Sequence, residues 1–529
     1  MSSYNLLEEK WIDCVDEQGV NRTFGLSDLI LEAHHIRSLA GEFPIINTSI
    51  LFMLEALLTS AFTKQGVALD DGSVWVDLFN VGRFEEGPFL DYVQAWRHRF
   101  NLFDEKLPFF QTSIPEEKEG QFTGTAMKLM PHYTGGTGGN SATLFDHHTS
   151  EEGIELTPKQ AAQFLLPAHY YGAGGRIMGR DYFSDAFTAN GLAFFLQGAN
   201  LFETLMLNLL PYPDVQDVKS GSADGPIWER ETPYEINGRA GVKDGKDTFY
   251  LPFGLMDLLT WPGRKIQLIR DEDGLVRTIR MRSGLKIKQN YFPWFAYNRK
   301  GNFIRAREGR MMWRDYDVLL QFRRMNKLDD LNRSPQAVDW LNENLEDLDE
   351  RVFTIYGAGM AKDAGKQKVH FYAESNFPLP TALLENNDRI IEIGYCLEQA
   401  EVIRKKLYGA TATLATQILA FTSDQSEGHQ PDKKDVGNLV DHLNAESVYW
   451  EALEPGFYNL ILRLPHDHEE SLRHWEEAVQ SAARAALAYA IRLAGESIAV
   501  WKASSHAQAI LEKGLKETLT MIRKEADHE

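Results

Sequence analysis

Residues 468–493 read HEESLRHWEEAVQSAARAALAYAIRL. Apolar side chains recur in this segment at steps of three and four residues, at Ala478, Ala482, Ala485, Tyr489 and Leu493. Such spacing places them in one stripe along an α-helix. From Pro380 onward the chain has the same character, and we predict further helices at 383–408, 411–422, 434–464 with a break at Pro455, and 496–522. The sequence therefore predicts an all-α C-terminal four-helix bundle over residues 380–529.

The chain before Pro380 has a different pattern, with short apolar or alternating runs separated by turn signals. We predict strands at 74–79, 248–253, 265–270 and 352–359. Helical patterns occur between them at 48–62 and 192–210. Because a single core rarely grows beyond about 300 residues, a chain of this length should divide. The predicted fold class is α+β, with a large irregular mixed α/β domain at 1–379 followed by the bundle at 380–529.

The overall composition limits the possible partners. The formal net charge of −21 argues against indiscriminate coating of DNA, because non-specific binding is mostly electrostatic. We find no apolar run that approaches 18 uncharged residues and no signal peptide, so we expect a soluble, cytoplasmic protein with no membrane partner. The two cysteines, Cys14 and Cys396, exclude a disulfide framework and a CxxC zinc site.

One segment, residues 276–314, departs from this acidic background, and we call it the basic island. It contains eleven Lys or Arg residues and one acid, Glu308. Seven aromatic residues are interleaved with them: Tyr291, Phe292, Trp294, Phe295, Tyr297, Phe303 and Trp313. Cations and flat rings together can bind a nucleic-acid backbone and its bases. A half-buried ribbon with core rings and a solvated basic face has the same composition, and composition alone favours it.

Two glycine-rich loops occur at 134–143 (TGGTGGNSAT) and 170–180 (YYGAGGRIMGR). Glycines allow backbone N–H groups to approach a phosphate or a base edge. Neither loop has the Walker A pattern or a GxGxxG pattern after a clear strand, and plain flexible loops are the ordinary interpretation. Arg176 and Arg180 follow the second loop, which favours a nucleic-acid contact there.

A catalytic constellation is not evident in the sequence. His147 and His148, or the PHDHEE segment at 465–470, could bind a metal ion. However, Asp467 with Glu470 also fits a capping box that opens the helix from His468. The lack of a recognisable catalytic motif favours a binding protein over an enzyme. A nucleotide- or metal-dependent hydrolase that uses the glycine-rich loops, and a scaffold without nucleic-acid contacts, remain open alternatives.

Five segments together resemble the CasA family, the large subunits of type I-E CRISPR surveillance complexes (Cascade). They are NLLEEKWI at 5–12, FNLFDEKLPFFQ at 100–111, NSATLFDHH at 140–148, GAGG at 172–175 and LNLLP at 207–211. The resemblance implies a non-enzymatic protein that recognises the protospacer-adjacent motif (PAM) in double-stranded DNA from the minor-groove side, while a guide RNA reads the remaining target.

The resemblance also implies which residues contact the motif. The glycine loop of the family falls on Gly172, Ala173, Gly174 and Gly175. Its lysine finger falls inside the basic island, on Lys288 in a hairpin at 286–288, with Lys286 as the second choice. A side chain larger than alanine in the glycine loop is expected to block the approach of a base pair.

A hairpin wedge that opens the duplex beside the motif is the third implied device. It maps onto the turn at 360–368, with the residues Lys362, Asp363, Ala364, Gly365, Lys366 and Gln367. Gln367 is the only glutamine near the turn, although it lies past the expected tip. We expect Lys362 and Lys366 to hold displaced phosphates.

The implied partners are the other Cascade subunits, the guide CRISPR RNA, double-stranded target DNA and a recruited helicase-nuclease. Contacts with the guide RNA and a neighbouring subunit map onto Leu144, Phe145, Asp146 and His147. Arg404, Lys405 and Lys406 are either DNA contacts of the bundle or solvated charges. We expect no metal ion and no other cofactor.

Overall fold

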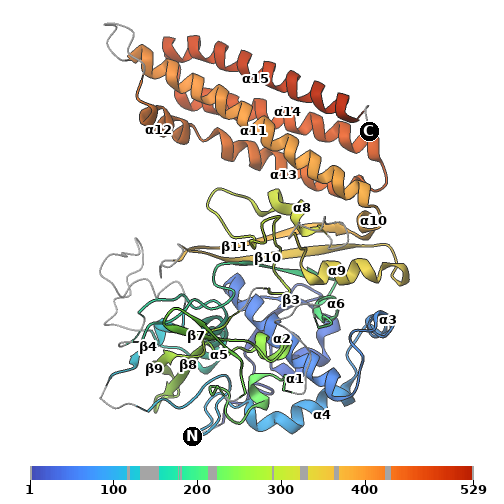
Figure 1. Cartoon of the computed structure of the whole chain (residues 1–529), viewed down its shortest axis with the longest axis vertical. Coiled ribbons are helices and arrows are strands. Elements are labelled where there is room, and N and C mark those ends of the chain that lie inside the picture. The colour runs from blue at the N-terminus through green and yellow to red at the C-terminus, as the bar shows by residue number, and fades with distance from the viewer. Residues whose placement is uncertain are drawn as a thin grey trace. The chain divides into compact units, whose positions relative to one another are not determined.

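The computed structural model describes residues 3–115, 120–130, 154–176, 178, 181–212, 223–236, 238–288, 291–321, 332–362, 369–422 and 431–526. The chain forms two compact units (Figure 1). The N-terminal unit comprises Met1–Glu308, Gln321–Asp349 and Phe353–Asn376. The helical unit comprises Gly309–Leu320, Glu350–Val352 and Phe377–Glu529. This division differs from a single boundary at 379/380, because two short earlier segments lie within the helical unit.

The N-terminal unit contains several small antiparallel sheets (Figure 1). One has the order β2-β1-β3, formed by Asn21–Phe24, Ile12–Asp16 and Ile36–Leu39. Another has the order β4-β9-β8, formed by Thr123–Thr125, Val276–Ser283 and Arg264–Arg270. A third has the order β11-β10-β5, formed by Val369–Pro380, Val352–Lys362 and Leu192–Gln197. A two-stranded ribbon pairs β6 with β7, formed by Gly241–Asp244 and Asp247–Tyr250.

Several helices of this unit pack against one long helix, α2 (Pro44–Lys64). The others are α1 (Leu26–Leu31), α3 (Gly72–Val81), α4 (Glu86–Trp96), α5 (Pro158–Tyr170), α6 (Leu201–Asn208), α7 (Leu255–Leu259) and α9 (Gln336–Glu343). Phe52 on α2 has ring neighbours on four sides, at centroid distances of 5.1–5.5 Å: Tyr170, Phe195, Phe292 and Trp294. These rings form the centre of the core.

Helix α2 qualifies one expectation from the sequence. It is long and apolar enough, by length and composition, to cross a membrane. In this structure 89% of its most apolar 18-residue window is buried, which is the environment of a core helix. The expectation therefore holds for uncharged runs, because Glu55 interrupts the segment between Pro44 and Thr63, but the apolar segment as a whole is as long as a membrane span.

Two predicted elements of the N-terminal unit have a different structure. Residues 74–79, predicted as a strand, lie in helix α3, which Asp71 caps by accepting the Ser73 N–H and which ends at Gly82 in the left-handed region. Residues 192–210, predicted as one helix, form β5 and then α6. Asn200 caps α6 by accepting the Glu203 N–H, and every residue from 192 to 196 is buried against its neighbours. Short apolar runs do not distinguish a strand from a helix.

The helical unit confirms the predicted fold class. Its described helices are α8 (Tyr316–Leu319), α10 (Thr381–Leu384), α11 (Asn387–Thr422), α12 (Lys433–Leu443), α13 (Ala445–Arg463), α14 (His468–Ala494) and α15 (Ile498–Ala526). Helix α11 packs against α15, and α13 packs against α14 (Figure 1). Two predicted boundaries were wrong. Residues 387–422 form one helix, and the break falls at Asn444, which has a φ of 51°, while Pro455 lies inside α13.

Candidate nucleic-acid interface

The aromatic residues of the basic island are mostly core residues. Phe292, Trp294, Phe295 and Tyr297 are buried in the N-terminal unit, and Trp313 is buried in the helical unit. The ring of Trp313 stacks on Phe457 with centroids 4.7 Å apart. For these rings the packed-ribbon interpretation is correct, because a ring in the core cannot stack on a base.

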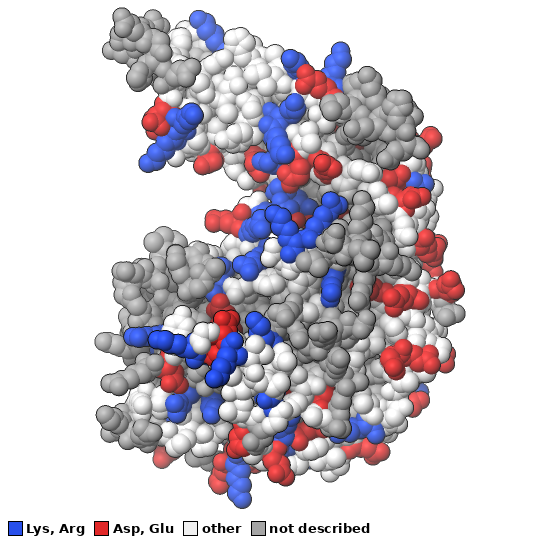
Figure 2. Space-filling model, in the orientation of Figure 1, with Lys and Arg blue, Asp and Glu red and all other residues white. Residues whose placement is uncertain are grey.

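About half of the island's cations are neutralised by acids. Arg277 contacts three carboxylates, and four further pairs join Arg282 to Asp181, Lys286 to Asp247, Arg310 to Asp315 and Arg314 to Glu401. Among the described residues, no acid pairs with Lys288 or Lys300. In the N-terminal unit, many Lys and Arg side chains seen in Figure 2 lie on the left, over the sheet of β4, β9 and β8, mixed with acids. The described part of the basic island therefore combines cations that pair with acids and a few cations that do not.

The glycine loop, residues 172–175, follows helix α5 and is fixed by backbone hydrogen bonds to the segment 183–186. Gly175 and Phe183 exchange two N–H···O bonds of 2.8 Å each, and the Ala186 N–H donates to the Gly172 carbonyl at 2.9 Å. Gly172 and Ala173 are buried, whereas Gly174 and Gly175 are partly exposed. Only the second half of the predicted loop therefore has backbone at the surface.

The glycines of this loop are required by the protein itself. A Cβ on Gly172 would lie 2.1 Å from Nε of Arg264, and a Cβ on Gly174 would lie 2.8 Å from the backbone nitrogen of Asp185. Gly175 has a φ of 114°, which side-chain-bearing residues rarely adopt. Substitutions at these positions consequently disturb the loop before any ligand approaches it.

Arg264, the first residue of β8, is buried and contacts the glycine loop from the protein interior. Its guanidinium donates to the carbonyl oxygen of Ala173 at 2.9 Å and lies over the ring of Phe183 at 5.2 Å from the centroid. Burial lowers the pKa of Arg264 to about 10, so this buried group stays charged at neutral pH. The buried Arg264 cation therefore holds the loop, and the Ala173 carbonyl oxygen accepts one of its hydrogen bonds.

Lys286 and Lys288 differ in their environments. The segment 286–288 runs parallel to β7 at Tyr250: the Tyr250 N–H donates to the Lys286 carbonyl and the Lys288 N–H donates to the Tyr250 carbonyl. Nζ of Lys286 lies 2.6 Å from Oδ1 of Asp247. Within the described residues, Lys288 has no such partner. The geometry thus supports Lys288 over Lys286 as a free cation.

Three segments that are distant in sequence meet near the glycine loop. Asp181 accepts from Nε of Arg282 at 3.2 Å and from the Ser283 N–H at 3.3 Å. Asp185 accepts from the Gly174 N–H at 2.5 Å and pairs with Nζ of Lys362 at 2.9 Å. The loop therefore lies beside the end of β9, five residues before Lys288, and beside the end of β10. Sequence reasoning missed Asp181, Asp185 and Arg264, because single charged residues without a spacing pattern give no signal.

The predicted wedge and RNA-contact residues are only partly described. Lys362 ends β10, and its side chain is fully buried in the ion pair with Asp185. In this structure the Lys362 ammonium group is therefore not presented at the surface, where a displaced phosphate would meet it. The described residues do not include Asp363, Ala364, Gly365, Lys366 and Gln367. They also do not include Leu144, Phe145, Asp146, His147 and His148, Arg180, or the loop at 134–143.

The groups proposed for metal binding make other contacts. Nε2 of His466 lies 3.3 Å from Glu350, and Nε2 of His468 lies 2.7 Å from Glu392. Asp467 occupies the N-cap of α14 without a side-chain capping bond, so the expected capping box does not form, and Glu470 pairs with Arg473. In the described part of the chain, no group of three or more His, Cys, Asp and Glu side chains could hold a metal ion.

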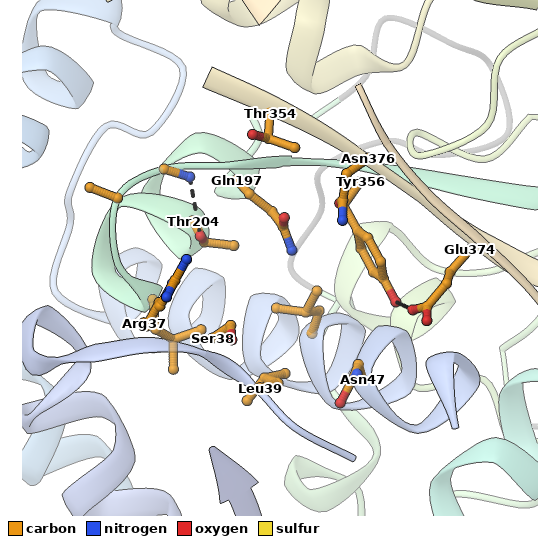
Figure 3. A pocket seen from close by; sticks show the side chains of 14 residues that line it. Arg37, Ser38, Leu39, Asn47, Gln197, Thr204, Thr354, Tyr356, Glu374 and Asn376 are labelled. Atoms are coloured by element: carbon orange, nitrogen blue, oxygen red, sulfur yellow. Dashed lines mark hydrogen bonds between the residues drawn. The ribbon is translucent and has the colours of Figure 1, made fainter. Parts of the chain in front are cut away.

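A polar cavity of about 460 Å³ lies elsewhere in the N-terminal unit. Gln197 and Asn376 lie across it from Asn47, and Arg37 lies at its side (Figure 3). The hydroxyl of Tyr356 donates to Glu374 at 3.2 Å, and burial raises the pKa of this phenol. The cavity is lined by neither a histidine nor a cysteine, and none of the predicted site residues reaches it. The residues that line the cavity therefore provide no Ser–His or Cys–His pair.

The three bundle cations are not equivalent. Arg404 pairs with Glu401 and Glu446, and Lys406 lies 3.5 Å from Glu517. Lys405 is exposed. Arg404 and Lys406 therefore pair with acids of the helical unit itself. This favours the interpretation as surface charges over the interpretation as DNA contacts.

Comparison with known proteins identifies the class. The model of the CRISPR-associated protein Cse1 family matches residues 5–486. The CRISPR-associated protein CasA/Cse1 of Thermus thermophilus is 30% identical over 499 residues, covering 91% of each chain. The crystal structure of Thermus thermophilus CasA has a TM-score of 0.77 at 25% identity, covering 98% of this chain and 100% of that one. A chain of a CRISPR RNA-guided surveillance complex shares the fold, with a TM-score of 0.71 at 20% identity, covering 97% and 100%.

These matches define a CRISPR-associated protein. The chain belongs to the Cse1 family, also called CasA, from residue 5 into helix α14. The resemblance seen in the sequence segments is thereby confirmed.

Proposed function

We propose that this protein is a non-catalytic subunit of a CRISPR RNA-guided surveillance complex and that its N-terminal unit recognises a short motif in double-stranded DNA. One observation carries the proposal. The glycine loop, the end of β9 that leads to Lys288, and the end of β10 are joined by Asp181, Asp185 and Arg264. These are the three segments that the family resemblance assigns to motif recognition and duplex opening.

The local chemistry suits readout from the minor groove. This groove is only about 6 Å wide and offers few distinguishing groups, so a reader needs backbone without side chains and few contacts. Gly174 and Gly175 supply such backbone at the surface. Lys288 supplies a cation that no described acid neutralises. Because a chain with a net charge of −21 repels DNA over most of its surface, its contacts with DNA are confined to such points.

The proposed partners follow from the same family. They are the other subunits of the complex, the guide RNA through Leu144, Phe145, Asp146 and His147, and a helicase-nuclease that degrades bound DNA. This division lets base pairing read the target, while the protein examines only the short motif.

The proposal is tested by assembling the complex with and without this chain. With the chain present, we expect a matched duplex that carries the motif to bind about tenfold or more tightly than the same duplex with the motif exchanged. Without the chain this preference should disappear. Motif preference that persists without the chain would assign the readout to another subunit. Cleavage of DNA by the purified chain, with stoichiometric bound metal, would favour the hydrolase alternative.

A further inference from the structure

The carboxylate of Asp185 connects three parts of the N-terminal unit. Its Oδ1 accepts the N–H of Gly174 at 2.5 Å. Its Oδ2 accepts from Nδ2 of Asn190 at 3.0 Å and lies 2.9 Å from Nζ of Lys362. One oxygen therefore binds the glycine loop, and the other binds the last residue of β10.

The two partners of this ion pair differ in exposure. The Lys362 side chain is 0% exposed, whereas the Asp185 side chain is 27% exposed. A buried cation is costly unless it is paired, and the Asp185 carboxylate is one partner of Lys362. Burial alone would raise the pKa of Asp185, but the hydrogen bonds from Asn190, Lys362 and the Gly174 N–H bring it below its usual value. The Asp185 carboxylate is therefore charged at neutral pH.

The ion pair lies beyond the point where the pairing of β10 with β5 ends. Strand β5 pairs with β10 from Thr354 to Gly359, and Gly359 is opposite Leu192, the first residue of β5. Residues 360–362 extend beyond this pairing, towards the turn that the sequence assigns to the wedge. Beyond Gly359, the ion pair of Lys362 with Asp185 attaches β10 to the segment that binds the glycine loop.

We propose that Asp185 is a positioning residue that fastens the glycine loop to the end of β10, so that motif contact and duplex opening are mechanically coupled. The inference rests on the proposed function of the two segments. DNA that contacts Gly174 would contact a loop whose position is fixed relative to β10, the strand that leads to the proposed wedge. Asp185 itself need not contact DNA.

The coupling can be separated from motif recognition by three variants in the assembled complex. Lys362→Met removes the cation and retains an unbranched apolar chain in the buried space, while Asp185 still accepts the Gly174 N–H. Asp185→Asn weakens the same pair from the other end, and its amide oxygen can still accept from Gly174. Asp185→Ala, the comparison variant, removes both bonds. The melting temperature of each purified variant checks folding, and the two pair-breaking variants test the link independently.

Two duplexes report the two functions, one fully paired and one mismatched beside the motif so that it is already open. Fluorescence of 2-aminopurine beside the motif reports opening. Lys362→Met and Asp185→Asn should keep the wild-type motif preference on the mismatched duplex and should open the paired duplex about tenfold more slowly. Asp185→Ala should also lose motif preference on the mismatched duplex.

Opening of the paired duplex at the wild-type rate by folded Lys362→Met or Asp185→Asn would overturn the coupling. Loss of motif preference by these two variants on the mismatched duplex would also overturn it, because the pair would then serve only the shape of the loop. Failure of the proposed function gives a different result, since the wild-type complex would show no motif preference on either duplex.

Discussion

Lys288→Ala is expected to weaken binding of the assembled complex to motif-bearing duplex about 5- to 150-fold, which corresponds to about 1–3 kcal/mol for a contact with a base edge. The backbone of Lys288 is held by Tyr250, whose carbonyl accepts its N–H at 2.9 Å. No acid among the described residues pairs with its ammonium group. A fixed backbone and a free cation are the properties that a reading side chain requires. Equilibrium binding at constant salt measures the loss.

Two matched controls separate base reading from general attraction. Lys300 is exposed in the same basic island, so Lys300→Ala should change the affinity less than about twofold. Lys286 is already paired with Asp247, so Lys286→Ala should also have a small effect. If Lys288→Ala weakens binding equally for duplexes with and without the motif, Lys288 contacts phosphate and its assignment as the finger is wrong.

Glu55→Leu is expected to stabilise the protein, and the gain should grow with pH. Glu55 lies in the core helix α2 with 1% exposure, and neither carboxyl oxygen has a hydrogen-bond partner among the described residues. Burial raises its pKa well above the ordinary value of 4.5. Between pH 5 and pH 7 the advantage of the leucine variant should increase with pH, by at most about 1.4 kcal/mol per pH unit, measured by chemical denaturation at each pH.

The sign follows from proton binding. In the folded protein Glu55 retains a proton that the unfolded chain releases above about pH 4.5, so its contribution is complete below that pH and is lost as the pH rises towards the folded-state pKa. Glu55→Gln is the control, because glutamine cannot ionise. Its stability relative to wild type should change with pH as that of Glu55→Leu does, while its overall stability should be lower than that of the leucine variant. A difference from wild type that does not vary with pH would mean that Glu55 is not buried as the structure has it.

The sequence predicted the elements whose signals are local. The apolar stripe of residues 468–493 predicted helix α14, because its period is repeated along the whole segment. The alternation at 265–270 predicted β8, and the glycine cluster at 172–175 marked the loop beside which the candidate segments meet. In each case one stretch of chain contains the necessary information.

The parts that sequence reasoning missed depend on contacts between distant segments. Asp185 binds Lys362 across 177 positions and Arg264 binds Ala173 across 91, and neither pair has a spacing that a sequence pattern could reveal. The helix break was predicted at Pro455 because proline disrupts helices, yet Asn444 in the left-handed region makes the break. Pro455 remains inside α13, within a unit whose packing outweighs its local cost.

Site-specific photo-crosslinking from position 288 tests the central claim most directly. Lys288 would be replaced by p-benzoylphenylalanine in the assembled complex, the complex would be irradiated on a motif-bearing duplex, and the crosslinked nucleotides would be mapped. Lys300, replaced in the same way, serves as the control. We predict crosslinks from position 288 at the motif base pairs and none there from position 300. Crosslinks from position 288 that avoid the motif, on a duplex that the complex binds, would contradict the assignment of the N-terminal unit as the motif reader.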